Sequence, residues 1–287
     1  MSIENNNIKN NNTIIIKKAS GEEEIFDIEK LKKSLRNAGV KDSIISKIAN
    51  DINNWVYPGV NTRKIYSRTF SILRKEKTTT ATRYKLKQAI RELGPTGYPF
   101  EKFIGQLFEK LDFKTQTGIV VEGNCVTHEM DVIATKDNIQ NLIECKYHKD
   151  QGRQVSIQVP LYVRSRVNDI INKRKNLPEY KGLSFTGWVI TNTRFSSESI
   201  KYGKCCGLNL MAWDYPKGNG LKDVIEKIKV HPITILNNLT KKEKIYLLEQ
   251  DIVCCQQLLK NIKYLDDLNL SNKKYNSLMN ELNDICI

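Results

Sequence analysis

The stretch THEMDVIATKDNIQNLIECKYH, residues 127–148, has the pattern of two short strands joined by a turn. Side chains alternate between the two faces of a strand, so Glu144 and Lys146 share one face while Cys145 between them takes the other. Asp131 lies on the preceding strand. We therefore expect two carboxylates and a lysine to project from adjacent strands into one small volume.

Two acids and a lysine in this arrangement are the side chains that a hard metal ion needs for phosphodiester hydrolysis. We expect Asp131, Glu144 and the backbone carbonyl of Cys145 to hold Mg²⁺ or Mn²⁺, and Lys146 to position or deprotonate the attacking water. Nearby carboxylates repel each other unless a cation lies between them, so the site should be electrostatically strained without metal. A solvated Glu–Lys pair beside an edge acid would explain the same residues without catalysis.

The charge of the chain points to a polyanionic partner. Its 287 residues are 40% hydrophobic and carry a formal net charge of +14, which favours nucleic acid or an anionic membrane surface. No apolar run approaches the ~18 residues needed to span a bilayer. We therefore expect a cytoplasmic protein that binds double-stranded DNA and no membrane. The seven cysteines have no C-x-x-C spacing, which fits a reducing compartment without a zinc cluster.

Periodicity around the two central strands predicts an α/β core with a mixed sheet. An amphipathic helix at 100–111 precedes them, with Glu101 at its start. The other expected elements are a strand at 118–121, a helix at 155–171, a strand at 185–191, a short helix capped by Ser196 or Ser197, and a strand at 208–213.

This core, residues 94–230, resembles the PD-(D/E)xK nuclease fold, and specifically its Mrr-like restriction endonuclease branch. The resemblance rests on the segments FEKFIGQLFEKLDF, HEMD, IECK, WVITNTRFS and LMAWDYP. It implies a metal-dependent DNA endonuclease in restriction or phage defence. Glu101 would bind a second ion or orient a water, and Gln158 would point into the cleft. Many Mrr-like proteins have Gln where this chain has Glu144.

Three further residues are candidates for DNA contacts. Arg164 and Arg166 lie on the helix after the central strands, and Asn192 follows a strand end where ligand-binding loops usually lie. A solvated helix face would explain the two arginines equally well, and Glu101 is also compatible with a solvated residue near a helix N-terminus.

Residues 13–93 read as a hairpin followed by four short helices, the last opening at Thr79 or Thr80, and they follow an Asn-rich tail at 1–12 that we expect to be disordered. The segment IIIKKASGEEEIFDIEKLKKSL resembles the ATP-cone, a regulatory nucleotide-binding module. The resemblance implies that ATP or dATP acts as an effector on the enzyme. By motif match, the nucleotide would be lined by Ile15, Lys17, Lys18, Lys30, Thr62 and Tyr66.

Clustered ammonium groups suit a triphosphate, which supports this assignment. Tyr66 stands where the family more often has His. A small basic helical domain that binds DNA is the alternative interpretation of this module. The module has no glycine-rich phosphate loop, so we do not expect ATP hydrolysis.

Residues 231–287 are expected to be helical. Apolar residues at Leu248, Ile252, Cys255, Leu259 and Ile262 suggest one continuous helix, and Leu278, Leu282 and Ile285 a second one. These faces could pack on the core or form a homodimer or higher oligomer. The rival to an enzyme is a non-catalytic, nucleotide-gated DNA-binding or regulatory protein, which would not need Asp131, Glu144 and Lys146.

Overall fold

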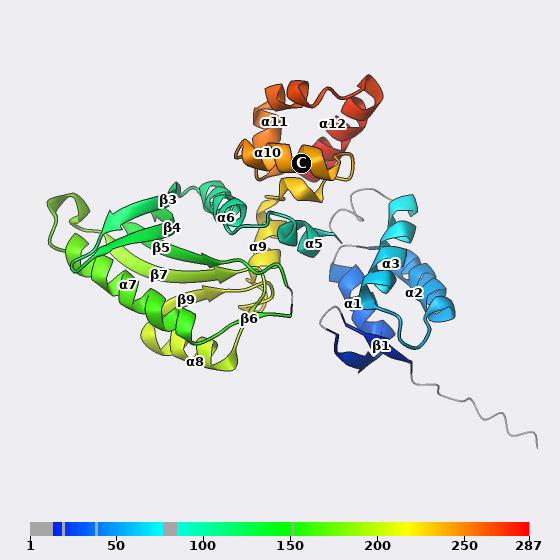
Figure 1. The fold of residues 1–287 in the computed structure, drawn as a ribbon, viewed down its shortest axis with the longest axis horizontal. Helices are drawn as coiled ribbons and strands as arrows, with labels where there is room; N and C mark the ends of the chain where they lie inside the picture. Colours follow the sequence, from blue (N-terminus) through cyan, green and yellow to red (C-terminus); the bar gives the residue numbers. More distant parts are fainter. Residues whose placement is uncertain (1–13, 19–20, 38–39, 77–84, 151, 287) are drawn as a thin grey trace, which may run out of the picture. The chain divides into compact units, whose positions relative to one another are not determined.

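The computed structural model describes residues 14–18, 21–37, 40–76, 85–150 and 152–286. Two compact units make up the chain, Met1–Tyr84 and Lys85–Ile287 (Figure 1). The tail expected at 1–12 and the helix start expected at Thr79 or Thr80 lie outside the described residues. No helix in the described part of the chain combines the length and apolar character needed to cross a membrane.

In its described residues, the first unit is a small hairpin with three helices. Strands β1 (Ile15–Lys17) and β2 (Glu23–Ile25) pair antiparallel. The helices are α1 (Ile28–Asn37), α2 (Asp42–Trp55) and α3 (Thr62–Glu76). The Asp27 side chain accepts a hydrogen bond from the backbone N–H of Glu29, which satisfies a free amide at the start of α1. Apolar faces of the helices bury a core that includes Leu35, Ile48, Ile52 and Leu73.

The second unit is built on a five-stranded sheet in the order β3-β4-β5-β7-β9. Its strands are β3 (Lys114–Glu122), β4 (Thr127–Lys136), β5 (Ile139–Lys146), β7 (Ser184–Thr191) and β9 (Leu208–Met211). Strands β3, β4 and β5 run antiparallel, whereas β5, β7 and β9 run parallel. This mixed sheet confirms the predicted α/β class. A separate pair, β6 (Gln154–Val155) and β8 (Arg194–Phe195), lies after β5 and β7.

Helices cover both faces of this sheet (Figure 1). On one face, α7 (Gln158–Arg174) and α8 (Ser197–Cys206) enclose a core with Leu142. On the other, α6 (Tyr98–Lys110) and α9 (Leu221–Ile228) share a core with Ile143 and Cys145. The alternation predicted for β5 is thus confirmed, because residues next to one another in sequence enter different cores.

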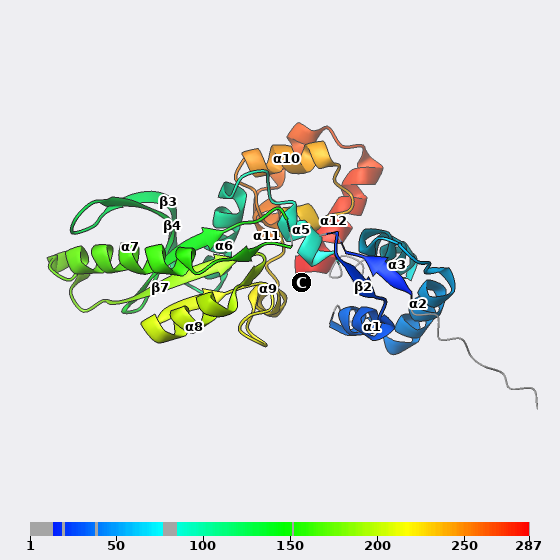
Figure 2. The same cartoon turned by 60° about the horizontal axis from the view of Figure 1, so that its bottom comes forward.

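The C-terminal helices belong to the same core as α6. They are α10 (Lys241–Glu249), α11 (Cys255–Lys260) and α12 (Asn272–Cys286), and Figure 2 shows them gathered beside α6. The continuous helix expected through Ile252 is wrong. The chain leaves the helical path at Asp251, which has φ of +59°, and buries Ile252 and Val253 in the turn. The helix expected around Leu282 is present as α12.

Only one division into units is found, between Tyr84 and Lys85. The boundary expected after Leu93 differs because α5 (Leu86–Arg91) buries its apolar side in the core of the second unit. Thr234, in the 3₁₀ turn Ile233–Ile235, donates a hydrogen bond of 2.6 Å to the Ala89 carbonyl. Residues 231–286 likewise pack into the second unit rather than forming one of their own. Two further 3₁₀ segments of this unit are Pro178–Tyr180 and Ile262–Leu268.

Candidate active site at the fork between two strands

Strands β4 and β5 part where the predicted site begins. Their last paired residues are Val132 and Ile143, and Asp131 and Glu144 stand one residue further. Beyond this point the side chain of Asp131, and not a backbone carbonyl of β4, bonds to β5. Its Oδ2 accepts a hydrogen bond of 2.6 Å from the backbone N–H of Cys145. The fork therefore fixes the Asp131 side chain against β5 instead of leaving it free in solvent.

Glu144 is the most enclosed charged group of the site. Only 4% of the residue is exposed, and both carboxylate oxygens have partners. Its Oε1 lies 2.9 Å from the Lys146 ammonium group and accepts a 2.8 Å hydrogen bond from the Tyr162 hydroxyl. Its Oε2 accepts a 2.6 Å hydrogen bond from Arg166, whose guanidinium also donates to the Glu129 carbonyl oxygen. Two cations and a hydroxyl thus offset the free-energy cost of burying this carboxylate.

Helix α7 supplies the side of the site that faces β5. Gln158, Tyr162 and Arg166 are spaced by four residues and therefore lie along one face of the helix. The centre of the Tyr162 ring is 5.5 Å from the Lys146 ammonium group and 5.4 Å from the Arg166 guanidinium, so the ring attracts both cations. The sequence argument missed Tyr162, although its spacing from Gln158 could have indicated it. Gln158 itself is exposed in the first turn of α7.

Carboxylates crowd the fork and alter one another's protonation. Burial and the charge of Glu144 raise the pKa of Asp131 to about 7, against the opposing effect of the Cys145 N–H. Burial also raises the pKa of Glu101, in the first turn of α6, and the charges of Glu129 and Glu144 raise it further. The electrostatic strain expected at the site is therefore present. Glu129 was also missed; its place two residues before Asp131 on one strand was the available signal.

Lys146 keeps its proton in this arrangement. Burial works against the charged form, but the hydrogen bonds and charges of Tyr162 and Glu144 outweigh it and raise the pKa of Lys146. Of the two roles expected for this lysine, positioning a water or stabilising negative charge fits its charged state. Deprotonating a water would need the neutral amine and does not fit.

The remaining DNA-contact candidates occupy different surroundings. Asn192 is buried, and its amide group exchanges two hydrogen bonds of 2.8 Å with the backbone of His148, so it ties the ends of β5 and β7 together. Arg164 lies close enough to Tyr202 of α8 to influence its pKa, which places it on the α8 side of α7. The sequence argument expected both to contact DNA directly, whereas the structure gives Asn192 a positioning role.

On the first unit, the predicted nucleotide-binding residues cluster around β1. Lys17 lies 3.8 Å from Glu23, Lys18 lies 3.3 Å from Glu22, and Lys30 lies 3.2 Å from Glu24. Each lysine therefore has a glutamate partner in an exposed pair. The backbone N–H of Lys17 donates to the Val60 carbonyl, which brings β1 beside the segment that opens α3 at Thr62. Ile15 is exposed on the hairpin, and Tyr66 is half-buried on α3.

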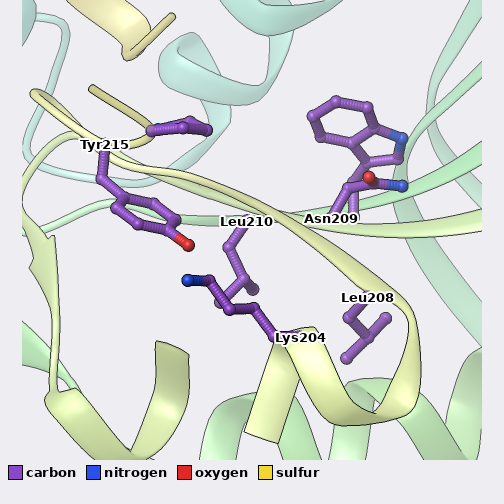
Figure 3. A pocket seen from close by; sticks show the side chains of 7 residues that line it. Lys204, Leu208, Asn209, Leu210 and Tyr215 are labelled. Carbon is purple, nitrogen blue, oxygen red and sulfur yellow. The ribbon is translucent and has the colours of Figure 1, made fainter. Parts of the chain in front are cut away.

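A hollow elsewhere on the second unit is unrelated to these side chains. It lies between the end of α8, β9 and the turn at Pro216, and its lining includes Trp188, Leu208 and Tyr215 (Figure 3). None of the predicted site residues lines it.

The donor set at the fork limits which metal site can form. Within the described parts of the chain, no three His, Cys, Asp or Glu side chains are gathered closely enough to hold one metal ion. Asp131 and Glu144 thus provide only two carboxylates. In a strand the N–H and C=O of one residue point to the same neighbouring strand, so the Cys145 carbonyl is directed toward the Asp131 side. These three oxygens suit a hard cation that keeps several waters, such as Mg²⁺.

Similarity to known proteins covers the second unit's C-terminal helices and much of the chain. The family described as AF1548-like, C-terminal, matches residues 231–286. An uncharacterized protein of Archaeoglobus fulgidus is 31% identical over 179 residues, which is 62% of this chain and 97% of the relative. The chain belongs to the AF1548-like family.

Two solved structures are also similar. The crystal structure of AF1548, a protein of unknown function, has 30% identity and a TM-score of 0.54, over 67% of this chain and 98% of that one. The MspJI restriction endonuclease, in complex with a 27-mer oligonucleotide, is more distant. It has 13% identity and a TM-score of 0.33, over 61% of this chain and 36% of that one.

Proposed function

We propose that this member of the AF1548-like family is a metal-dependent DNA endonuclease that hydrolyses phosphodiester bonds in restriction or phage defence. The observation that carries the proposal is the fork at Asp131, where two carboxylates from adjacent strands stand one residue beyond the ladder and Lys146 lies beside them. A carboxyl group whose pKa is raised to about 7 by burial and a neighbouring acid is typical of functional sites.

Asp131, Glu144 and the Cys145 carbonyl would hold Mg²⁺ or Mn²⁺. The ion would lower the pKa of a bound water and offset the charge of the phosphate. Arg166 and Tyr162 keep Glu144 oriented through their hydrogen bonds to its two oxygens. This holds one carboxylate in place whether or not substrate is present.

The other side chains act on the substrate and the water. Lys146, which stays charged, stabilises negative charge that develops on the phosphate oxygens during attack. We assign to Glu101 the orientation of the attacking water, because it lies close enough to Glu129 and Glu144 for their charges to raise its pKa and is thus beside the proposed metal ligands. Gln158 contacts the substrate from the exposed first turn of α7.

We further propose that the first unit is an ATP-cone-like sensor that binds ATP or dATP. Lys17, Lys18 and Lys30 would exchange their glutamate partners for the phosphate groups. These pairs are exposed and therefore weak, so parting them costs little free energy.

Cleavage of supercoiled plasmid with Mg²⁺ or Mn²⁺, with and without ATP or dATP, tests the proposal. Asp131→Asn, Glu144→Gln and Lys146→Met should each lower the cleavage rate by at least about 10²- to 10³-fold, the effect of removing one preorganised group. DNA binding should persist in all three. Glu122→Gln, at the exposed end of β3, is the matched control and should cleave normally.

Two outcomes would change the assignment. Cleavage retained by Lys146→Met would remove that lysine from the mechanism. DNA binding by the wild-type protein without cleavage under any of these conditions would support the non-catalytic, nucleotide-gated regulator instead.

A further inference from the structure

The fork by itself is a poor attractor for a polyanion. Acidic side chains outnumber cationic ones there, and the groups concerned are Glu101, Glu129, Asp131, Glu144, Lys146 and Arg166. Both cations are also engaged with Glu144. A DNA strand carries one charge at each phosphate, so attraction must come from cations outside the fork.

A second group of charges lies further along the same edge of the sheet. The Trp213 cluster consists of Lys87 on α5, Arg194 on β8, Trp213 after β9 and Lys222 on α9. The Lys87 ammonium group lies 5.7 Å from the centre of the Trp213 ring. Among the described residues, no carboxylate forms an ion pair with Lys87, Arg194 or Lys222.

The three cations of the cluster act on one another. Although Lys87 is an exposed residue, partial burial of its ammonium group lowers its pKa, and the charges of Lys222 and Arg194 lower it further, while Asp214 opposes them. Like charges held this close raise the free energy of the cluster unless an anion neutralises them. The local chemistry therefore favours an anionic ligand.

Hydrogen bonds connect the Trp213 cluster to the fork along the carboxyl ends of the parallel strands. Thr191 donates to the Lys146 carbonyl at 2.7 Å, and Thr193 lies 2.9 Å from His148 Nδ1. The Thr193 carbonyl then accepts a hydrogen bond of 3.1 Å from the backbone N–H of Trp213. The Trp213 carbonyl in turn accepts one from the backbone N–H of Lys222. A rigid edge thus fixes the cluster relative to the site.

The spacing along this edge suits a nucleic-acid backbone. Strand β7 separates β5 from β9, so the strand that precedes Trp213 lies two strand spacings, roughly 10 Å, from β5. That is about three nucleotide rises of a duplex strand. In Figure 1 the parallel strands end on the side of α5 and α9, the helices that carry Lys87 and Lys222.

We propose that the Trp213 cluster binds phosphates of the DNA strand that flank the scissile phosphate, and that it supplies much of the affinity that the acidic fork lacks. The inference rests on the proposed nuclease function, because it places the cleaved phosphate at the fork. Lys87, Arg194 and Lys222 contact the backbone, and Trp213 holds the Lys87 ammonium group in position. Contacts of this kind depend on charge and not on base sequence.

Fluorescence anisotropy with a labelled DNA duplex tests the cluster without requiring cleavage. The parent is Asp131→Asn, which should bind DNA and leave it intact. Adding Lys87→Gln, Arg194→Gln and Lys222→Gln should lower affinity by roughly 10²-fold at 0.1 M salt and make the slope of log K against log [salt] shallower by about 2 to 3. A triple control, Lys241→Gln, Lys242→Gln and Lys260→Gln, removes the same charge from exposed positions of the C-terminal helices.

The proposal predicts that the control retains the parent's affinity and salt slope. Equal losses in both triple variants, or no loss in the Trp213-cluster variant, would overturn it. If the parent binds no DNA, the cluster and the nuclease assignment both fail. If the cluster variants behave as expected but wild-type protein never cleaves, only the nuclease assignment fails.

Discussion

The hairpin of the first unit and the fork of the second pair the same kinds of charged side chain, but they differ in burial. On the hairpin, the side chains of Lys18 and Glu22 are 39% and 70% exposed. At the fork, the Glu144 side chain is 5% exposed between Arg166 and Lys146. Water surrounds both partners of the first pair, whereas the carboxylate of the second is shielded from it. We infer that the hairpin can exchange its partners for a ligand, whereas the fork holds a fixed geometry.

The largest expected effect concerns pH and Asp131. Its pKa is about 7 in the folded, metal-free chain but ordinary in the unfolded one, about 3.9. Between these values the folded chain holds a proton that the unfolded chain has lost, so stability falls as pH rises through this window. In EDTA, the Asp131→Asn variant should lack this fall. Its free energy of unfolding should exceed that of the wild type by up to roughly 4 kcal/mol at pH 8. Urea unfolding from pH 4 to 8 measures it.

Glu24 on the hairpin provides the opposite sign for comparison. Partial burial works against its charged form, but ion pairs with Lys30 and Lys18 lower its pKa overall. The contribution of Glu24 to the stability of the folded chain is therefore present at neutral pH and is lost as pH falls through the acid range. Glu24→Gln should be slightly less stable than wild type near neutrality and equal to it in acid.

For Asp131, parallel curves of unfolding free energy against pH for wild type and Asp131→Asn would contradict the electrostatics of the fork.

The second largest expected effect is the loss of stability when one cationic side chain is removed from the fork and, for comparison, from the hairpin. Arg166→Met removes a partner of a buried carboxylate and should lower the free energy of unfolding by about 3 kcal/mol. Lys18→Met removes a partner of exposed carboxylates and should leave the free energy of unfolding nearly unchanged. Urea denaturation of both variants compares them directly. Equal costs would mean that Glu144 is not enclosed as the structure shows.

The smallest effect concerns nucleotide binding by the hairpin. Lys17→Gln or Lys18→Gln should weaken ATP or dATP binding by roughly tenfold, since each removes one charge-assisted contact of about 1.5 kcal/mol. Arg36→Gln loses an equally exposed ion pair at the other end of α1 and should bind normally. Isothermal titration calorimetry on the full chain measures all three. No heat from wild-type protein at millimolar nucleotide would remove the sensor from the proposal.

Local periodicity determined much of this protein. Alternation along residues 127–148 placed Asp131, Glu144 and Lys146 in one volume, because the face of a strand residue follows from its position alone. The strands and helices of the α/β core followed from the same kind of pattern. Helix α8 begins after Ser196, one of the two caps expected.

Only the tertiary structure decided what depends on contacts between distant residues. Tyr162 and Arg166 reach Glu144 because α7 packs on the face of the sheet that carries this side chain, and Glu129 joins the site because β4 packs beside α6. The raised pKa of Lys146 depends on Tyr162, which only the packing of α7 brings near, as well as on Glu144 of its own strand. Helix α5 joined the second unit because its apolar residues found their core there. Sequence patterns specify a residue's face, whereas burial and partners follow from how the elements pack.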